Sequence, residues 1–233
     1  MIKTNRLMGG ILLIAGTSIG AGMLALPVVS GFAGFMPSLG LLLFCWLYML
    51  ITAFLILEVN LSLTGEVNML TMAEATLGKF GKLVTWITYL LLLYSLTAAY
   101  MAGSGPLFNE GLKALFSFSL PVWMRPLPLL IFLGIFLYLG TKATDYVNRV
   151  FMGGLIITFF VMAFFVPSHI KFSLLQHVDL KASVVAIPVI ITSFGFHIVI
   201  PTMTTYLDHN PKKLRLAIFI GSSIPLLIYL LWQ

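Results

Sequence analysis

Long apolar runs separated by short polar stretches make up most of this sequence. An α-helix needs about 20 predominantly apolar residues to cross a bilayer. Seven runs reach or approach that length, and they cover residues 8–30, 36–59, 83–105, 127–141, 149–167, 183–206 and 216–232. The pattern predicts an all-α polytopic membrane protein with a single transmembrane domain, 1–233, in contact with the lipid bilayer. We expect the first run to stay in the mature protein, because it is longer than the apolar core of a signal peptide.

The stretch 61–82, between the second and third runs, mixes charged and apolar residues at helical spacing. Its charged residues are Glu66, Glu74, Lys79 and Lys82. This pattern predicts a short amphipathic helix on the cytoplasmic surface. We expect the segments 106–126 and 168–182 to be the longer external loops.

Composition supports a membrane protein and excludes a soluble domain. Hydrophobic residues make up 60% of the chain and charged residues 9%, whereas a soluble domain has about 25% charged residues. The net charge of +6 follows the positive-inside rule when the N-terminus is cytoplasmic. The cytoplasmic Lys and Arg would then be Lys3, Arg6, Lys79, Lys82, Lys142, Arg149, Lys212, Lys213 and Arg215, and the external ones Lys113, Arg125, Lys171 and Lys181. We therefore expect the N-terminus inside and no nucleic-acid partner.

No pattern in the sequence indicates an enzyme or a metalloprotein. Cys45 is the only cysteine, so no intrachain disulfide can form, and no Cys or His pair has zinc-ligand spacing. Paired intramembrane carboxylates, an HExxH motif and a nucleophile beside a base are all missing. The glycine-rich stretch 16–22 lacks the Lys and the preceding strand of a phosphate-binding loop. We expect no catalytic residues, no metal and no cofactor.

Two of the seven runs carry helix-breaking residues near their middle. In the first run, three glycines and two hydroxyl residues fall within 16–22, and Pro27 follows. Glycine weakens a helix, and hydroxyl groups offer substitute hydrogen bonds inside a membrane. In the sixth run, the segment 193–197 lies between Pro188 and Pro201, which disfavours helix on both sides. We expect both helices to unwind at these segments.

The two breaks are five spans apart, so the first and sixth helices would cross the membrane in opposite directions. Interrupted spans at corresponding positions of two halves are typical of secondary transporters built from inverted repeats. The first repeat would cover 1–167, and a partial second repeat 183–233. For Gly16 and Gly20 the alternative is a contact face of small residues, because they are four positions apart.

Unwound helices in a membrane present main-chain groups that need partners. The half-helix that starts near residues 21–23 would direct N–H groups and a positive dipole end at a carboxylate. Carbonyls at 15–17 and 192–194 would suit an ammonium group or a small cation. The two poles together predict a site for an α-amino acid. The candidate substrate-binding residues in these segments are Gly16, Thr17, Ser18, Gly20, Ala21, Gly22, Ser193, Phe194, Gly195 and Phe196.

Aromatic residues at a similar depth favour a substrate with an aromatic side chain. The candidates are Phe194, Phe196, Tyr94 and Tyr100. Because 13% of the chain is aromatic, packing against lipid or other helices is an equal alternative for the two tyrosines.

His197 and Glu58 are the candidates for proton coupling. His197 lies inside the sixth-span break, and imidazole titrates near neutrality. Glu58 is the carboxylate placed within a predicted span, where a central charge costs about 2.5–3.5 kcal/mol. The alternatives are a structural hydrogen bond for His197 and contact with interfacial water for Glu58.

Five stretches resemble the bacterial hydroxy/aromatic amino acid permease family, and most closely its tyrosine-specific members. They are AGTSIGAGMLALP (15–27), LILEV (55–59), LTAAY (96–100), AIPVIITSFGFH (186–197) and KLRLAIFIGSSIPLLIYLLWQ (213–233). The resemblance implies symport of a proton with tyrosine, or with tryptophan or phenylalanine, across the bacterial inner membrane. It also implies the leucine-transporter-like inverted-repeat fold of the amino acid/polyamine/organocation class.

The resemblance places the family's substrate region at 16–22 and 193–197. Members of the family carry more spans than the seven predicted here, so the chain would be truncated after the second helix of the second repeat. A helix that normally closes the site beside the first span would be missing. A receptor or sensor that binds the amino acid without transport, or an inactive truncated permease, is therefore the alternative function.

Overall fold

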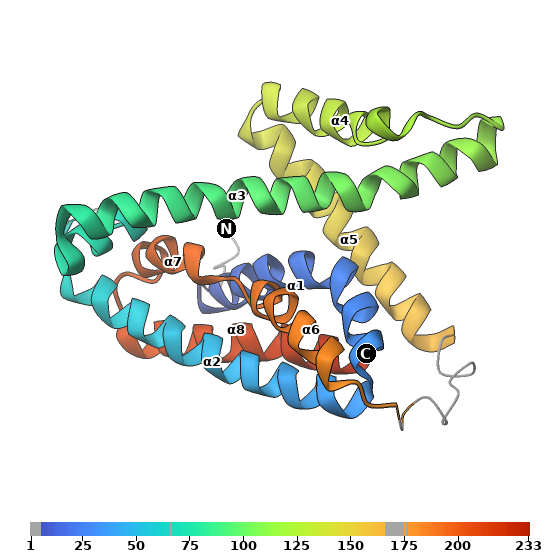
Figure 1. Ribbon diagram of the computed structural model, residues 1–233. Helices are drawn as coiled ribbons and strands as arrows, with labels where there is room; N and C mark the ends of the chain where they lie inside the picture. The colour runs from blue at the N-terminus through green and yellow to red at the C-terminus, as the bar shows by residue number, and fades with distance from the viewer. Residues whose placement is uncertain (1–5, 66, 166–174, 176) are drawn as a thin grey trace. The chain divides into compact units, whose positions relative to one another are not determined.

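The computed structural model describes residues 6–65, 67–165, 175 and 177–233, and every regular element among them is a helix (Figure 1). The chain divides into two compact units, Met1–Leu83 with His169–Gln233, and Val84–Ser168. Helix α3 (Met69–Phe116) contributes its first residues to the first unit and the rest to the second.

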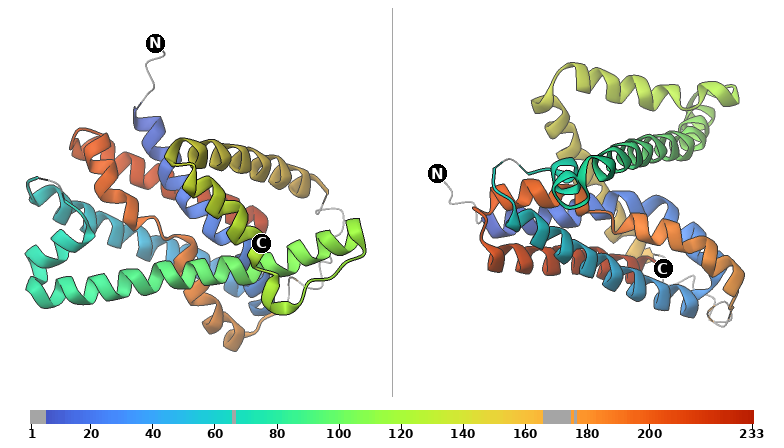
Figure 2. Two further views of the ribbon diagram at one scale, coloured as in Figure 1. Left: turned by 90° about the horizontal axis from the view of Figure 1, so that it is seen from above. Right: turned by 60° about the vertical axis from the view of Figure 1, so that its left-hand side comes forward.

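The first unit is built around α1 (Arg6–Ala33). It also contains α2 (Phe35–Ser62), α6 (Leu180–Ser193), the 3-10 turn η4 (His197–Val199), α7 (Ile200–Tyr206) and α8 (Pro211–Trp232). Helix α1 packs against α6 and α8, and α2 packs against α6, α7 and α8 (Figure 2). A Cβ at Gly221 of α8 would lie 2.8 Å from the Ile14 Cβ, so a glycine lets these two helices approach closely.

Capping residues fix where the helices of the first unit begin. The Asp179 carboxylate accepts hydrogen bonds from the N–H groups of Lys181 and Ala182 at the start of α6. Gly34, between α1 and α2, has φ 92° and lies so close to the His177 carbonyl that a Cβ would overlap it. The chain at this turn therefore requires glycine.

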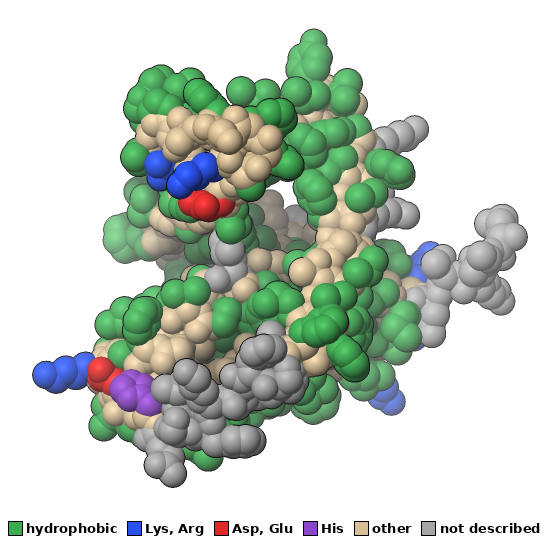
Figure 3. All heavy atoms as spheres, turned by 90° about the vertical axis from the view of Figure 1, so that its right-hand side faces the viewer, with side chains coloured by type: hydrophobic (Ala, Val, Ile, Leu, Met, Phe, Trp, Pro, Cys, Tyr) green, Lys and Arg blue, Asp and Glu red, His purple; other side chains and the backbone are tan. Residues whose placement is uncertain are grey.

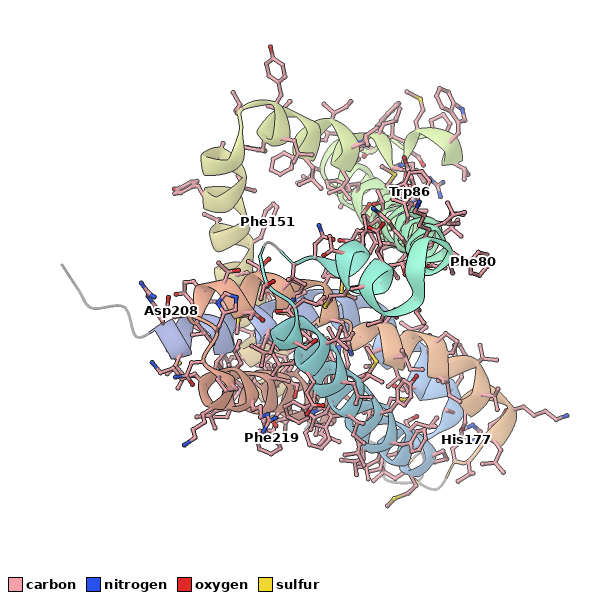
Figure 4. The ribbon with its side chains drawn as sticks, turned by 90° about the vertical axis from the view of Figure 1, so that its left-hand side faces the viewer. Phe80, Trp86, Phe151, His177, Asp208 and Phe219 are labelled. Atoms are coloured by element: carbon pink, nitrogen blue, oxygen red, sulfur yellow. The ribbon has the colours of Figure 1, made fainter. Side chains whose placement is uncertain are left out.

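The sixth predicted span crosses the first unit from end to end. His177 before α6 and Asp208 after α7 lie at opposite ends of the unit (Figure 4). Asp208 forms an exposed ion pair with Arg6 at 2.5 Å, which joins the end of α7 to the start of α1.

The second unit continues α3 and adds η1 (Val122–Met124), α4 (Leu127–Tyr138) and α5 (Thr141–Phe165). Helices α4 and α5 pack against each other. The predicted external loop 106–126 is wrong in its first half, because α3 continues through Pro106 to Phe116. A proline is tolerated within an apolar helix when neighbouring groups satisfy the carbonyl that it leaves free.

Four helices among the described residues are long and apolar enough to cross a membrane, or up to five when the bent α1 counts as one span. The predicted runs 127–141 and 149–167 correspond to two shorter apolar helices, Val122–Tyr138 and Val150–Phe165. Hydrophobic side chains are spread widely over the face shown in Figure 3, and the charged side chains visible there are few and lie singly or in small groups. The chain is therefore a multi-pass membrane protein.

The predicted amphipathic helix at 61–82 exists but begins later. Helix α2 ends at Ser62, and α3 begins at Met69. Gly78 has φ 71° and interrupts α3, so a short helix precedes the long one. Glu74 pairs across the interruption with Lys82 at 2.6 Å. Glu66 and residues 168–174 and 176 of the second predicted loop lie outside the described residues.

Candidate functional site

The sixth span is broken where the sequence predicts. Helix α6 ends at Ser193, residues 194–196 are not helical, and the helix resumes through η4 into α7. A Cβ at Gly195 would lie 2.8 Å from the Thr192 carbonyl oxygen, so this turn favours glycine.

The first span, in contrast, stays helical through residues 16–22, and the prediction of an unwound segment there is wrong. Instead, α1 bends by 62° between Arg6–Gly20 and Ala25–Ala33. Pro27 explains this position, because it has no N–H for the Met23 carbonyl and its ring clashes with that carbonyl. The Trp232 indole N–H donates to the Met23 carbonyl at 3.2 Å and replaces the bond that Pro27 cannot make.

Tyr229 of α8 joins the bend of α1 to the break of α6. Its side chain is fully buried. Its hydroxyl lies 2.6 Å from the Ser18 carbonyl oxygen, 3.5 Å from that of Ile19 and 3.3 Å from that of Ser193. Its ring packs edge-on against Phe194, with the ring centres 5.5 Å apart. The two interrupted spans therefore lie side by side around one tyrosine.

Gly22 makes this arrangement sterically feasible. A Cβ there would overlap the Tyr229 hydroxyl and lie 2.8 Å from the ring carbon Cε1. Gly20 is exposed, and a Cβ there would meet nothing within 4 Å. Among the described residues no atom approaches Gly20 in this way, and the close contact lies at Gly22; the small-residue contact face at Gly16 and Gly20 stays an alternative.

The hydroxyl side chains of the predicted site differ in their partners. The Thr17 hydroxyl donates to the Leu13 carbonyl at 2.8 Å, and the Ser193 hydroxyl to the Val189 carbonyl at 2.7 Å. The Ser18 hydroxyl is buried and has no hydrogen-bond partner in the described part of the chain. Gly16 is half-buried, and the side chain of Ala21 lies outside what the structure describes.

Phe196 and His197 lie on the other side of the α6 break. Phe196 is fully buried in the cluster that also holds Ile14 and Met203, and its ring stacks on His197 at 5.1 Å. The His197 Nε2 atom lies 2.9 Å from the hydroxyl of Thr52 on α2. Because that hydroxyl can direct its hydrogen to carbonyls of its own helix, its oxygen can accept from the imidazole N–H.

The remaining predicted site residues are Glu58, Tyr94 and Tyr100. Glu58 is 63% exposed and pairs with Arg215 at 3.6 Å, so its partner is a surface arginine. Tyr94 and Tyr100 lie on the part of α3 that belongs to the second unit, and their place in a site stays a prediction.

Sequence reasoning missed Tyr229, Trp232 and Thr52. Buried tyrosine and tryptophan usually find partners for their polar atoms, and both lie in the apolar run 216–232. Pro27 signals that the Met23 carbonyl needs a donor, but nothing local in the sequence indicates that Trp232 supplies it.

Comparison with known proteins shows extended similarity. The model of the tryptophan/tyrosine permease family matches residues 3–233. Tyrosine-specific transport systems 1 and 2 of Haemophilus influenzae are 37% and 38% identical, over 98% and 100% of this chain and 57% and 58% of their own lengths. The tryptophan-specific transport protein of the same organism is 32% identical, over 99% of this chain and 58% of its own length. The chain thus spans somewhat more than half the length of these relatives.

No solved structure matches this chain. The family that does match is one of permeases and not of enzymes. On the strength of a match that runs over 3–233, the chain belongs to the tryptophan/tyrosine permease family.

Proposed function

We propose that this chain carries the substrate site of a secondary active transporter that imports an aromatic amino acid, with tyrosine as the first candidate, by proton symport. The observation that carries the proposal is the convergence of the Ser18 and Ser193 carbonyls on one point, the Tyr229 hydroxyl. These carbonyls come from the bent and the broken span. Interrupted spans are where transporters of inverted-repeat design bind their substrates.

The chemistry of this point suits the ammonium end of an amino acid. Three main-chain carbonyls of the described residues lie within 3.5 Å of the Tyr229 oxygen, and an ammonium group brings three N–H donors. Because α1 stays helical through its bend, it offers no separate helix start there, and the position of the substrate carboxylate stays a prediction from the sequence.

The side chains beside this point favour an aromatic substrate. Phe194 is fully buried against Tyr229, and offset or edge-on contacts between rings add to the energy of burial. Phe196 and Tyr100 are further candidates for this role. Tyrosine is preferred to tryptophan because, among the relatives from Haemophilus influenzae, the two tyrosine-specific transport systems reach 37% and 38% identity and the tryptophan-specific transport protein 32%.

His197 is the stronger of the two candidates for the proton carrier. It begins η4 directly after the α6 break and contacts Thr52 of α2, so a change in its protonation would act on two spans. Glu58 is exposed and paired with Arg215. We place the protein in the bacterial inner membrane with the N-terminus in the cytoplasm, on the distribution of Lys and Arg.

The test is uptake by the purified chain in sealed vesicles. Labelled tyrosine should accumulate saturably when the outside is acidic, and a protonophore should abolish accumulation. Unlabelled tryptophan and phenylalanine, added in excess, rank the substrates. Saturable binding of tyrosine without flux would favour a receptor or sensor, and absence of both binding and flux would overturn the proposal.

A further inference from the structure

The Tyr229 hydroxyl lies where carbonyls of two spans meet. It is 2.6 Å from the Ser18 carbonyl oxygen, 3.5 Å from that of Ile19 and 3.3 Å from that of Ser193. A hydroxyl has one hydrogen, so it donates fully to one of these carbonyls at a time. The cluster is buried and rich in acceptors, which favours any group that brings more donors or a positive charge.

We propose that Tyr229 is a positioning residue whose hydroxyl fastens the bend of α1 to the break of α6, and that the ammonium group of the substrate competes with it for the Ser18 and Ser193 carbonyls. The competition between the hydroxyl and the ammonium group rests on the proposed function. The fastening, that is the hydrogen-bonded link between α1 and α6, does not. Space supports the competition, because the hydroxyl fills the room between these carbonyls and Gly22, where even a Cβ would overlap it. The hydroxyl must therefore move before a ligand atom can take its place.

The ring of Tyr229 is held independently of its hydroxyl. It packs edge-on against Phe194 and belongs to the buried cluster that includes Leu26 and Ile190. Removing the oxygen alone, by Tyr229→Phe, leaves this packing in place. The variant therefore separates the hydrogen bonds from the packing.

Two other variants serve as controls. Trp232→Phe removes a donor from the same helix, but the acceptor that the structure describes for it, the Met23 carbonyl, belongs to α1. Tyr138→Phe removes a hydroxyl from a side chain of the second unit that is 92% exposed.

The fastening is tested by hydrogen–deuterium exchange on the purified chain in detergent, with no amino acid added. Removal of a net hydrogen bond of ordinary strength should speed exchange of the amides in 18–24 and 193–199 by about threefold to tenfold in Tyr229→Phe. Trp232→Phe should speed exchange in α1 but not in 193–199, and Tyr138→Phe should change neither. Unchanged exchange in Tyr229→Phe would overturn the fastening.

The competition is tested by tyrosine binding to the same proteins. Tyr229→Phe should bind tyrosine more tightly, by about threefold to tenfold, because the ammonium group no longer displaces a hydroxyl. Weaker binding would make the hydroxyl a ligand of the substrate, and unchanged binding would make it a packing group; either result overturns the competition. If the unsubstituted chain binds no tyrosine, the proposed function fails, while the exchange measurement still decides the fastening.

A second measurement avoids deleting the hydroxyl and so does not depend on the folding of the variant. 3-Fluorotyrosine, placed at position 229 alone, reports the surroundings of this ring by fluorine NMR. Its resonance should shift when tyrosine is added, in proportion to the bound fraction. A resonance that stays in place at saturating tyrosine would show that the hydroxyl does not move, and the competition would be wrong.

Discussion

Two glycines of one stretch, Gly20 and Gly22, should respond in opposite ways to the same substitution. A Cβ at Gly22 would overlap the Tyr229 hydroxyl and lie 2.8 Å from the ring carbon Cε1. A Cβ at Gly20 would meet nothing within 4 Å. Both residues lie in α1, so alanine improves helix propensity equally at the two positions, and the difference between the variants measures the contact with Tyr229.

The magnitudes follow from three effects. Overpacking of a tightly filled site costs about 1–3 kcal/mol. Displacing the Tyr229 hydroxyl leaves the buried Ser18 and Ser193 carbonyls without this donor, which costs about 1–3 kcal/mol more. Alanine in a helix offsets about 0.5–1 kcal/mol of this cost. Gly22→Ala should therefore lower the free energy of unfolding by about 1–5 kcal/mol, whereas Gly20→Ala should raise it by about 0.5–1 kcal/mol.

The assay is reversible unfolding of the purified chain in mixed micelles, with increasing SDS and far-ultraviolet circular dichroism as the signal. A double-mutant cycle identifies the cause. Once Tyr229→Leu has shortened the opposing side chain, adding Gly22→Ala should cost less than about 1 kcal/mol, because the two sites are in contact and their effects do not add. A Gly22→Ala variant as stable as Gly20→Ala would refute the described contact between α1 and α8.

Three further substitutions test other contacts of the first unit. Trp232→Phe should lower the free energy of unfolding by about 1–2 kcal/mol. The loss should be smaller in a Pro27→Ala background, because residue 27 then has an N–H for the carbonyl to which Trp232 donates. The same SDS titration measures both effects. Thr52→Val removes the hydroxyl that contacts the His197 imidazole, so the pH midpoint of tyrosine uptake in vesicles should shift, whereas His197→Ala removes the titrating group and should abolish that midpoint. Glu58→Gln should leave the pH midpoint of uptake unchanged, because the carboxylate is exposed. A shifted midpoint would show that Glu58 takes part in proton coupling.

The break of the sixth span could be predicted from the sequence because a glycine is followed by a proline in an apolar run. Helix α6 passes through Pro188 without interruption, whereas Pro201, at the start of α7, has no N–H for the His197 carbonyl and disfavours helix before it. The first span is different. Its glycines lower helix propensity but keep their N–H groups, and in an apolar environment the helix is the state that satisfies them. In α1 only Pro27 lacks an N–H donor, so the helix bends in the turn that precedes this proline.

Part of the candidate site was visible in the sequence and part was not. Ser18, Gly22, Ser193 and Phe194 meet at Tyr229, and the sequence pattern indicated all four. Tyr229 itself could not be found in this way, because its contact with Ser18 spans 211 residues of sequence. The local sequence pattern indicates which main-chain groups lose their hydrogen-bond partners. It does not indicate which distant side chain replaces those partners.

The position of Glu58 shows a second limit. Its place in an apolar run suggested a costly buried charge. In the structure it lies about one turn before the end of α2 at Ser62, where Arg215 of α8 approaches from the start of its own helix. The exact depth of a residue depends on where the helix ends, and a hydrophobic run defines that end only to within a turn.

The spacing of donors on α8 explains how α1 keeps a 62° bend inside an apolar protein. Tyr229 and Trp232 are three residues apart and so lie on one face of α8. They reach one carbonyl before the bend, that of Ser18, and one within it, that of Met23. Straightening or tilting α1 relative to α8 would separate these donors from their carbonyls, at about 1–3 kcal/mol for each buried group left unpaired. A movement of α1 that opens the site is therefore inexpensive only when α8 moves with it, or when a bound ammonium group takes over the carbonyls that Tyr229 releases.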